Sequence, residues 1–77
     1  MFRTLVKTEE VAFDDQRVPV HYFELRTVRG LRRYSAEIWL GSEDRVILDD
    51  DSVSKLQARA ARLVPATIYS RILAGIP

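Results

Sequence analysis

Apolar side chains recur at short intervals through the first part of the chain, and turn-forming residues divide them into four segments. Residues 2–13 alternate imperfectly between apolar and charged side chains, a pattern that predicts a strand and allows a bulge in it. Residues 18–28 and 31–40 are rich in β-branched and aromatic side chains, which favour strands. Residues 45–48 form a shorter segment that contains three consecutive apolar residues. The pattern therefore predicts four strands joined by turns.

Beyond residue 48 the apolar period lengthens to that of a helix. Five apolar residues form one stripe at helical spacing: Val53, Leu56, Ala60, Leu63 and Val64. Asp50, Asp51 or Ser52 is expected to cap this helix, because each side chain has an oxygen that accepts the free N–H groups of a first turn. Pro65 is expected to kink the helix, to break it or to open a second one, and Gly75 is expected to end the helical segment.

These elements predict one α+β domain over residues 1–77. An antiparallel sheet of three to four strands is followed by a C-terminal helix, which is kinked or broken at Pro65 and packs on one face of the sheet. A short helix after a proline is unstable alone, so its apolar side chains are expected to cover the sheet or to form the interface of a homodimer. These side chains are Ile68, Tyr69, Ile72 and Leu73.

The second and third strands form the hairpin that carries the predicted binding face. A two-residue turn is expected at Arg29-Gly30, with the glycine supplying a positive φ. This register places Arg26 opposite Arg33 and brings four arginine and aromatic side chains to one face. They are Tyr22, Arg26, Arg33 and Trp39. The opposite face, with Phe23 and Leu25, is expected to pack on the helix, and a turn longer by one residue would exchange the faces.

Two arginines that lie directly opposite each other on paired strands repel each other weakly, so an anionic group is expected to offset this repulsion. Glu24 and Glu37 lie on the same predicted face and can do so as surface ion pairs. Single-stranded DNA or RNA can also do so, because phosphates pair with arginine while bases stack on Tyr22 and Trp39. A protein partner is the third alternative, since tryptophan, tyrosine and arginine are enriched at interface hot spots.

A second basic feature lies on the predicted helix. Lys55, Arg59 and Arg62 are spaced at i, i+4 and i+7, so they share a stripe. The stripe is interpreted either as a solvated face or as a phosphate-contacting edge that supports the sheet face. The whole chain has 12 Lys plus Arg against 11 Asp plus Glu, so its net charge does not by itself indicate nucleic acid.

Composition and chemistry favour a non-enzymatic protein without a cofactor. The absence of cysteine excludes disulfides, thiolate zinc sites and a cysteine nucleophile, and it favours a reducing compartment. No apolar run approaches the roughly 20 residues of a membrane span, so the protein is predicted to be cytoplasmic, without a membrane partner. His21 is the only histidine, and no serine has a visible activating partner. The acidic run at residues 49–51 is interpreted as favouring the helix N-terminus rather than as a metal site.

The segment from "YFELRTVRGLRRYSAEIWL" through "RVILDDDSVSKLQARAARL", about half of the chain, resembles the positive-cofactor-four family of single-stranded-DNA-binding transcriptional coactivators. In that family a curved four-stranded antiparallel sheet leads directly into a helix, and two chains form a dimer. The likeness lies in the step from strand to helix, where Ile47 and Leu48 precede the aspartates and Val53 precedes Leu56. The family's connection before the last strand is longer and lysine-rich, whereas here it is "GSED". The resemblance implies functional roles for four residues: Arg26, Arg33, Tyr22 and Trp39.

Overall fold

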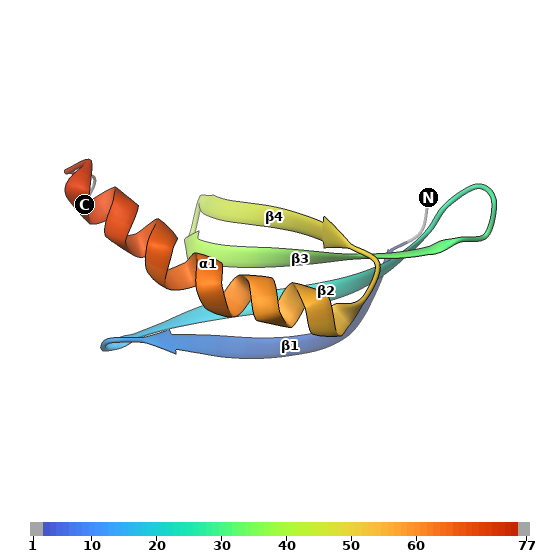
Figure 1. Cartoon of the computed structure of the whole chain (residues 1–77), viewed down its shortest axis with the longest axis horizontal. Helices are drawn as coiled ribbons and strands as arrows, with labels where there is room; N and C mark the ends of the chain where they lie inside the picture. The colour runs from blue at the N-terminus through green and yellow to red at the C-terminus, as the bar shows by residue number, and fades with distance from the viewer. Residues whose placement is uncertain (1–2, 76–77) are drawn as a thin grey trace.

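The computed structural model describes residues 3–75, which form a four-stranded antiparallel sheet and one helix (Figure 1). The elements are β1 (Arg3–Phe13), β2 (Gln16–Arg26), β3 (Arg32–Gly41), β4 (Asp44–Asp50) and α1 (Val53–Leu73). The strands lie side by side in chain order, so a short turn joins each strand to the next. The helix follows the last strand directly and lies against one face of the sheet (Figure 1). The predicted α+β class and the C-terminal helix are confirmed.

The first strand has one irregularity near its start. Leu5 pairs with Phe23 and Lys7 pairs with Tyr22, so Val6 has no residue opposite it. An extra residue of this kind is a β-bulge, which interrupts the ladder and increases the local twist. The bulge that the imperfect alternation allowed in the first strand is therefore confirmed.

The turn between β2 and β3 is one residue longer than the predicted two-residue turn. The Thr27 N–H donates to the Leu31 carbonyl at 3.0 Å, and the Gly30 N–H donates to the Thr27 carbonyl at 2.9 Å. These bonds close a three-residue loop, and Gly30 has the positive φ, +79°, that its last residue requires. Every pair between β2 and β3 is consequently shifted by one residue from the predicted register.

This shift changes the faces of the hairpin, because a slip of one residue exchanges the two faces of a strand. In β3, Ala36 and Ile38 face the helix as predicted. In β2, Tyr22 and Arg26 lie on the helix side of the sheet, whereas the prediction placed them beside Arg33 on the opposite side. Tyr22 is fully buried, so its predicted place on an exposed binding face is wrong.

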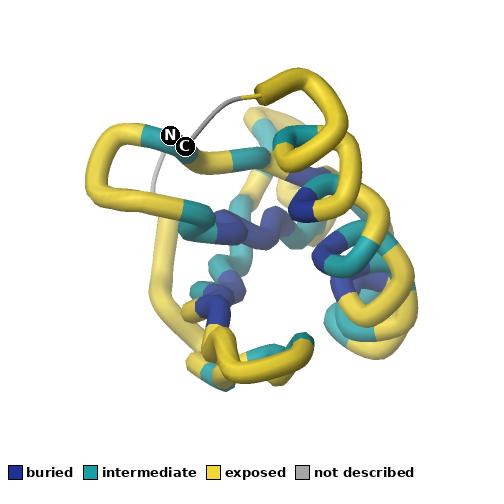
Figure 2. The backbone as a smooth tube through the Cα atoms, turned by 90° about the vertical axis from the view of Figure 1, so that its left-hand side faces the viewer, coloured by how far each residue is buried: buried dark blue, intermediate teal, exposed yellow. Residues whose placement is uncertain are grey.

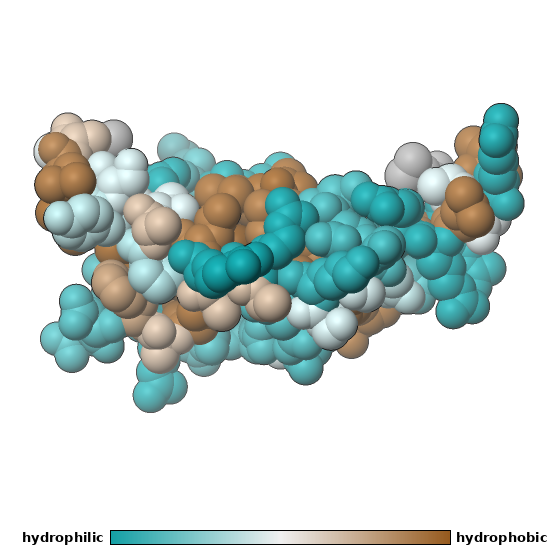
Figure 3. Space-filling model, viewed as in Figure 1, coloured by the Kyte–Doolittle hydropathy of each residue, from teal (hydrophilic) through white to brown (hydrophobic). Residues whose placement is uncertain are grey.

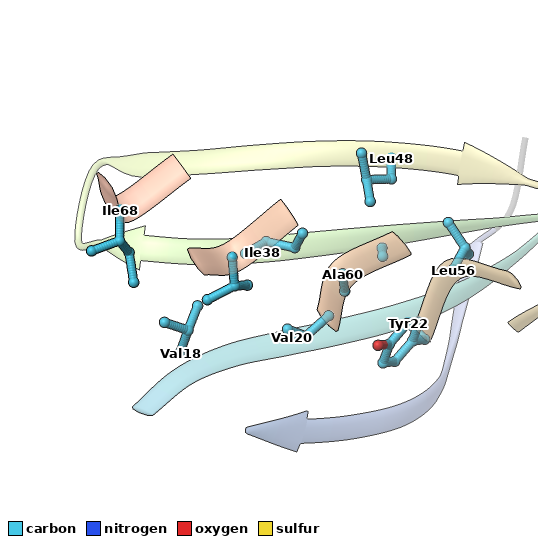
Figure 4. Close-up of a cluster of buried hydrophobic side chains, with 10 residues drawn as sticks. Val18, Val20, Tyr22, Ile38, Leu48, Leu56, Ala60 and Ile68 are labelled. Carbon is cyan, nitrogen blue, oxygen red and sulfur yellow. The ribbon is translucent and has the colours of Figure 1, made fainter. Parts of the chain in front are cut away.

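The core lies between the sheet and α1 (Figure 4). Figure 2 shows the buried segments of the sheet and of the helix turned toward each other. The buried apolar residues are Val18, Val20, Tyr22, Ala36, Ile38, Leu48, Leu56, Ala60, Val64 and Ile68. The four members from α1 are spaced by four residues, so they form one row along the helix. Val53 and Leu63 pack beside this row, which confirms the predicted apolar stripe.

One polar group links three elements at the edge of the core. The Tyr22 hydroxyl on β2 donates to one carboxylate oxygen of Glu9 on β1. The side-chain amide of Gln57 on α1 donates to the other oxygen at 3.2 Å. Burial of the phenol, and then the hydrogen bond to the Glu9 carboxylate, raise the pKa of Tyr22 above its usual value. The neutral phenol therefore serves as a fixed donor that ties β1 to β2.

Both ends of α1 lie where the sequence predicts them, and Pro65 lies inside one continuous helix. The Ser52 hydroxyl caps the helix by accepting a hydrogen bond from the Lys55 N–H at 3.2 Å. Gly75 adopts a φ of +71° just beyond the last turn and ends the helix. The helix continues through Pro65 as one element, so two of the three alternatives, a break and a second helix, are wrong. Burial of its apolar row on the sheet offsets the hydrogen bond that the proline ring removes.

The turns after Pro65 dock on the protein's own sheet. Ile68 packs in the core, and Arg71 donates two hydrogen bonds to Asp44, at 2.6 and 2.7 Å. Ile68 is therefore buried against the protein's own sheet, which excludes it from the predicted dimer interface. The three other predicted interface residues remain exposed: Tyr69, Ile72 and Leu73.

Candidate nucleic-acid interface

The face of the sheet opposite α1 is not covered by any described element, and we call it the open face (Figure 2). Alternation along the strands places the odd-numbered residues of β2 and β4, and those of β3 up to Trp39, on this face. Its side chains are Arg3, Leu5, Thr8, Glu10, Ala12, Arg17, Pro19, His21, Phe23, Leu25, Arg33, Ser35, Glu37, Trp39, Arg45, Ile47 and Asp49. The open face thus combines arginines and aromatic rings with aliphatic side chains.

A buried carboxylate lies near the centre of the open face. Glu37 lies between His21 on β2 and Ile47 on β4, and only 3% of its surface is exposed. Its Oε2 accepts hydrogen bonds from Arg45 Nη1 at 2.8 Å and from Arg3 Nη1 at 3.2 Å. A buried carboxylate requires such charged donors. Glu37 in turn holds the two guanidinium groups in defined positions on the surface.

Each of these arginines also lies over an aromatic ring. Arg3 Cζ is 4.0 Å from the centre of the Phe23 ring, and Arg45 Cζ is 5.3 Å from the centre of the Trp39 ring. Both distances are in the range of cation–π attraction. The two arginine side chains remain 49% and 46% exposed. The open face therefore presents two arginine–aromatic couples, Arg3–Phe23 and Arg45–Trp39, joined by one carboxylate.

The four predicted sheet residues do not form one constellation. Arg33 and Trp39 lie on the open face, as predicted. Tyr22 lies in the core, and Arg26 projects from the helix side, where its Nε is 3.5 Å from an oxygen of Glu24. The Trp39 Nε1 is buried and has no hydrogen-bond partner within residues 3–75. The register shift in β2 is the physical reason for this separation.

The acidic run at residues 49–51 pairs with the cations that the sequence prediction assigned to nucleic acid. Three ion pairs result: Arg33–Asp49 at 2.6 Å, Lys55–Asp51 at 2.9 Å and Arg59–Asp50 at 3.2 Å. Hydrogen bonding to these carboxylates raises the pKa of Arg33 and of Lys55. Of the predicted helical stripe, only Arg62 has no ion pair with another described residue. The stripe is therefore largely neutralised by its own strand-to-helix connection.

Sequence reasoning missed three residues of the open face: Arg3, Phe23 and Arg45. Arg45 lies opposite Trp39 because Leu40 in β3 has no residue opposite it; regular pairing from the Gly41–Asp44 pair would place Leu40 there, so the sequence pattern did not indicate this contact. Phe23 was assigned to the core because the predicted register of β2 was wrong by one residue. Arg3 reaches Glu37 from a strand whose register depends on the bulge, and no sequence signal gives the position of that bulge.

Within residues 3–75, no group of three or more histidine, aspartate or glutamate side chains is arranged to hold a metal ion. No helix in the same range is long and apolar enough to cross a membrane. Comparisons of the chain with protein-family models, with curated proteins and with solved structures found no match.

Proposed function

We propose that this protein is a non-enzymatic binding module that holds single-stranded nucleic acid on its open face. The observation that carries the proposal is the presence of two arginine–aromatic couples, Arg3–Phe23 and Arg45–Trp39, on an uncovered sheet. Proteins bind single strands by combining cations that follow the phosphates with aromatic rings on which bases stack. A cytoplasmic location is part of this proposal, supported by the absence of cysteine from the sequence.

The couples can accept a strand without disturbing the core. Each guanidinium has five N–H donors, so the hydrogen bond to Glu37 leaves others for phosphate oxygens. Moving a half-exposed guanidinium off a ring costs about 0.5–1 kcal/mol. Stacking one base on an aromatic side chain contributes about 1–3 kcal/mol, so exchange of the guanidinium for a base is favourable.

The resemblance to the positive-cofactor-four family supports the same class of ligand. Of the four residues that the resemblance implies, Arg33 and Trp39 lie on the open face. Arg33 is held by Asp49, so we assign the phosphate contacts mainly to Arg3 and Arg45. Tyr22 has no part in the proposed contact because it is buried beneath α1.

The test is a fluorescence titration of Trp39, the only tryptophan of the chain, with a mixed-sequence single-stranded oligonucleotide at low and at moderate salt. Saturable quenching that weakens as salt rises is expected, because phosphate contacts release counterions from the strand. Arg45→Gln is expected to weaken binding. Arg62→Gln, which removes an exposed charge from α1, is the matched control and is expected to bind as the wild type does.

Two results would contradict the proposal. One is an unchanged Trp39 signal at excess oligonucleotide and low salt. The other is an equal loss of affinity in Arg45→Gln and Arg62→Gln, which would mean that binding follows net charge and not the open face. Circular dichroism of each variant shows that the comparison is made between folded proteins.

A second candidate function is protein binding or self-assembly, and a homodimer is its simplest form. The exposed apolar end of α1 favours it: Tyr69, Ile72 and Leu73. Leu5 and Ile47 add exposed aliphatic surface on the open face. Sedimentation equilibrium of the wild type and of Tyr69→Ser/Ile72→Ser tests this alternative. A two-chain mass that falls to one chain in the variant supports a dimer through the helix end, and a one-chain mass in both contradicts it.

A further inference from the structure

The hairpin between β2 and β3 extends beyond the described ends of its neighbours. The described part of β1 begins opposite Leu25, and β4 ends opposite Tyr34. The end of the hairpin over residues 26–33, which we call the arm, therefore projects from one end of the sheet (Figure 1). Its strand pairing beyond Leu25 and Arg33 is the Arg26–Arg32 pair, and residues 27–31 form the turn. The three-residue loop at its tip is held by the backbone hydrogen bonds of Thr27.

The arm has four arginines and no acidic residue: Arg26, Arg29, Arg32 and Arg33. Arg26 and Arg32 lie directly opposite each other, where like charges are unfavourable. They share one carboxylate, Glu24, at 3.5 and 3.9 Å, and both side chains are 62% exposed. Arg29 at the tip has no ion pair with any residue in the range 3–75. The arm thus carries more positive charges than it has carboxylate partners.

Apolar side chains lie among these cations at the tip. Val28 is fully exposed, and Leu31 is 64% exposed. Figure 3 shows hydrophobic surface directly beside strongly hydrophilic surface at this end of the molecule. Scattered exposed apolar residues are common. Their position at the tip of a projecting, arginine-rich arm is what requires a functional explanation.

We propose that the arm is a second nucleic-acid site, which enters the major groove of duplex DNA. The major groove of B-form DNA is about 12 Å wide and admits a two-stranded β-ribbon. Strand alternation places Arg26 and Arg32 on one side of the arm, where they face the phosphates of one groove wall. Arg29 supplies a further phosphate contact from the tip, whereas Arg33 is held by Asp49. Val28 and Leu31 then contact base edges, including the thymine methyl group.

This site differs from the open face in its ligand and, apart from Arg33, in its residues. The arm reads a duplex through a narrow projecting element, whereas the open face stacks single-stranded bases on its aromatic rings. The major groove of A-form RNA is too narrow for side chains to read, so the arm is expected to discriminate duplex DNA from duplex RNA. The inference goes beyond the proposed function and does not depend on it.

The experiment is a fluorescence-anisotropy titration of a labelled mixed-sequence DNA duplex, repeated at several salt concentrations. The test variant is Arg29→Gln/Arg32→Gln, and the control is Arg17→Gln/Arg62→Gln, which removes the same charge from exposed sites on β2 and α1. The test variant is expected to lose about tenfold or more in affinity at low salt and to reduce the salt slope by about 2. The control is expected to stay close to the wild type. Val28→Ser/Leu31→Ser is expected to weaken binding without changing the slope.

Any of three results would overturn the inference: no duplex binding by the wild type at low salt, equal losses in test and control variants, or equally tight binding of duplex RNA. Tighter binding of a single strand, lost in the same arm variant, would also overturn it. A Trp39 titration of the same arm variant with single strands tests the open face separately. Failure of one proposal can therefore be distinguished from failure of the other.

Discussion

The two faces of this sheet bury their central residues by different means. On the face beneath α1, Val20, Tyr22 and Ile38 are buried by a helix that packs an apolar row against them. On the open face, Ser35 and Glu37 are also buried, although no described element covers that side. There the covering is made by neighbouring side chains, above all the two arginines that bind Glu37.

The helix-covered face therefore stabilises the fold, whereas the open face can change its contacts. The helix-covered face is held by close packing, which has one favourable arrangement and resists change. The cover of the open face consists of half-exposed guanidinium groups held by hydrogen bonds and ring contacts, each of modest energy. A ligand can replace those contacts without unfolding the domain. The following predictions test whether the two faces differ in this way.

The largest effect is expected from a cavity on the helix-covered face. Leu56 is fully buried, and Leu56→Ala is expected to lower the free energy of unfolding by about 2–5 kcal/mol because the remaining structure cannot fill the space. Urea unfolding followed by circular dichroism measures the loss. Leu73→Ala, at the exposed end of the same helix, is the control and is expected to change stability by less than about 0.5 kcal/mol. Similar losses in both variants would contradict the division between core and surface along α1.

A smaller loss of stability is expected from removing a charged contact on the open face. Arg45→Gln leaves the buried Glu37 carboxylate with Arg3 as its remaining partner, which is expected to lower stability by about 1–3 kcal/mol. The double variant with Glu37→Gln should lose less than the sum of the single variants, with a coupling of at least about 0.5 kcal/mol. Thermal unfolding of the four proteins completes the cycle. Strictly additive losses would mean that this carboxylate does not hold the arginine.

Alkaline pH is expected to lower the free energy of unfolding through Tyr22, which lies on the helix-covered face. Its pKa is raised in the folded protein, whereas the unfolded chain ionises near the ordinary value of 10.0. Below that pH both states keep the proton. Above it the unfolded state releases a proton that the folded state retains, so stability falls as pH rises further. Urea unfolding at about pH 9 and about pH 11 measures the fall.

Two variants identify the group responsible for this pH dependence. Tyr22→Phe is expected to show a flatter alkaline dependence than the wild type, because the phenol that resists ionisation has been removed. Tyr69→Phe changes an exposed tyrosine and is expected to keep the wild-type dependence. Identical alkaline slopes in wild type and Tyr22→Phe would show that the buried phenol is not the source.

The smallest effect is expected for an exposed side chain on the open face. Ile47→Ser is expected to change the free energy of unfolding by less than about 0.5 kcal/mol, because Ile47 is already more than half exposed. Ile38→Ser, in the neighbouring strand and fully buried, is the matched contrast and should be strongly destabilising. A loss in Ile47→Ser that approaches that of Ile38→Ser would mean that a second chain covers the open face in solution.

Local signals in the sequence predicted the elements but not their alignment. The spacing of Leu56, Ala60 and Val64 was sufficient for the helix, and the capping role of Ser52 follows from its side-chain chemistry. The glycine of the Arg29-Gly30 turn also has the expected positive φ. These features depend on residues close together in the chain, where a pattern has few competing interpretations.

The candidate site was harder to predict because it depends on register. One additional loop residue moved Tyr22 into the core and Phe23 onto the open face, although the side-chain types in β2 suit either face. The contact between Arg3 and Glu37 joins residues 34 positions apart and requires three strands to be aligned correctly. Sequence patterns describe single strands well, but they do not determine how far one strand is displaced along the next.

The bulge at Val6 also affects how this protein meets other copies of itself. β1 lies at an edge of the sheet, and a long regular edge strand is a template on which another chain can add its own strand. The unpaired residue breaks the even spacing of backbone donors and acceptors along that edge. The charged side chains of Lys7, Glu9 and Glu10 follow directly after it. The sheet is therefore protected at its N-terminal edge against growth into aggregates, while its hairpin arm and open face remain accessible.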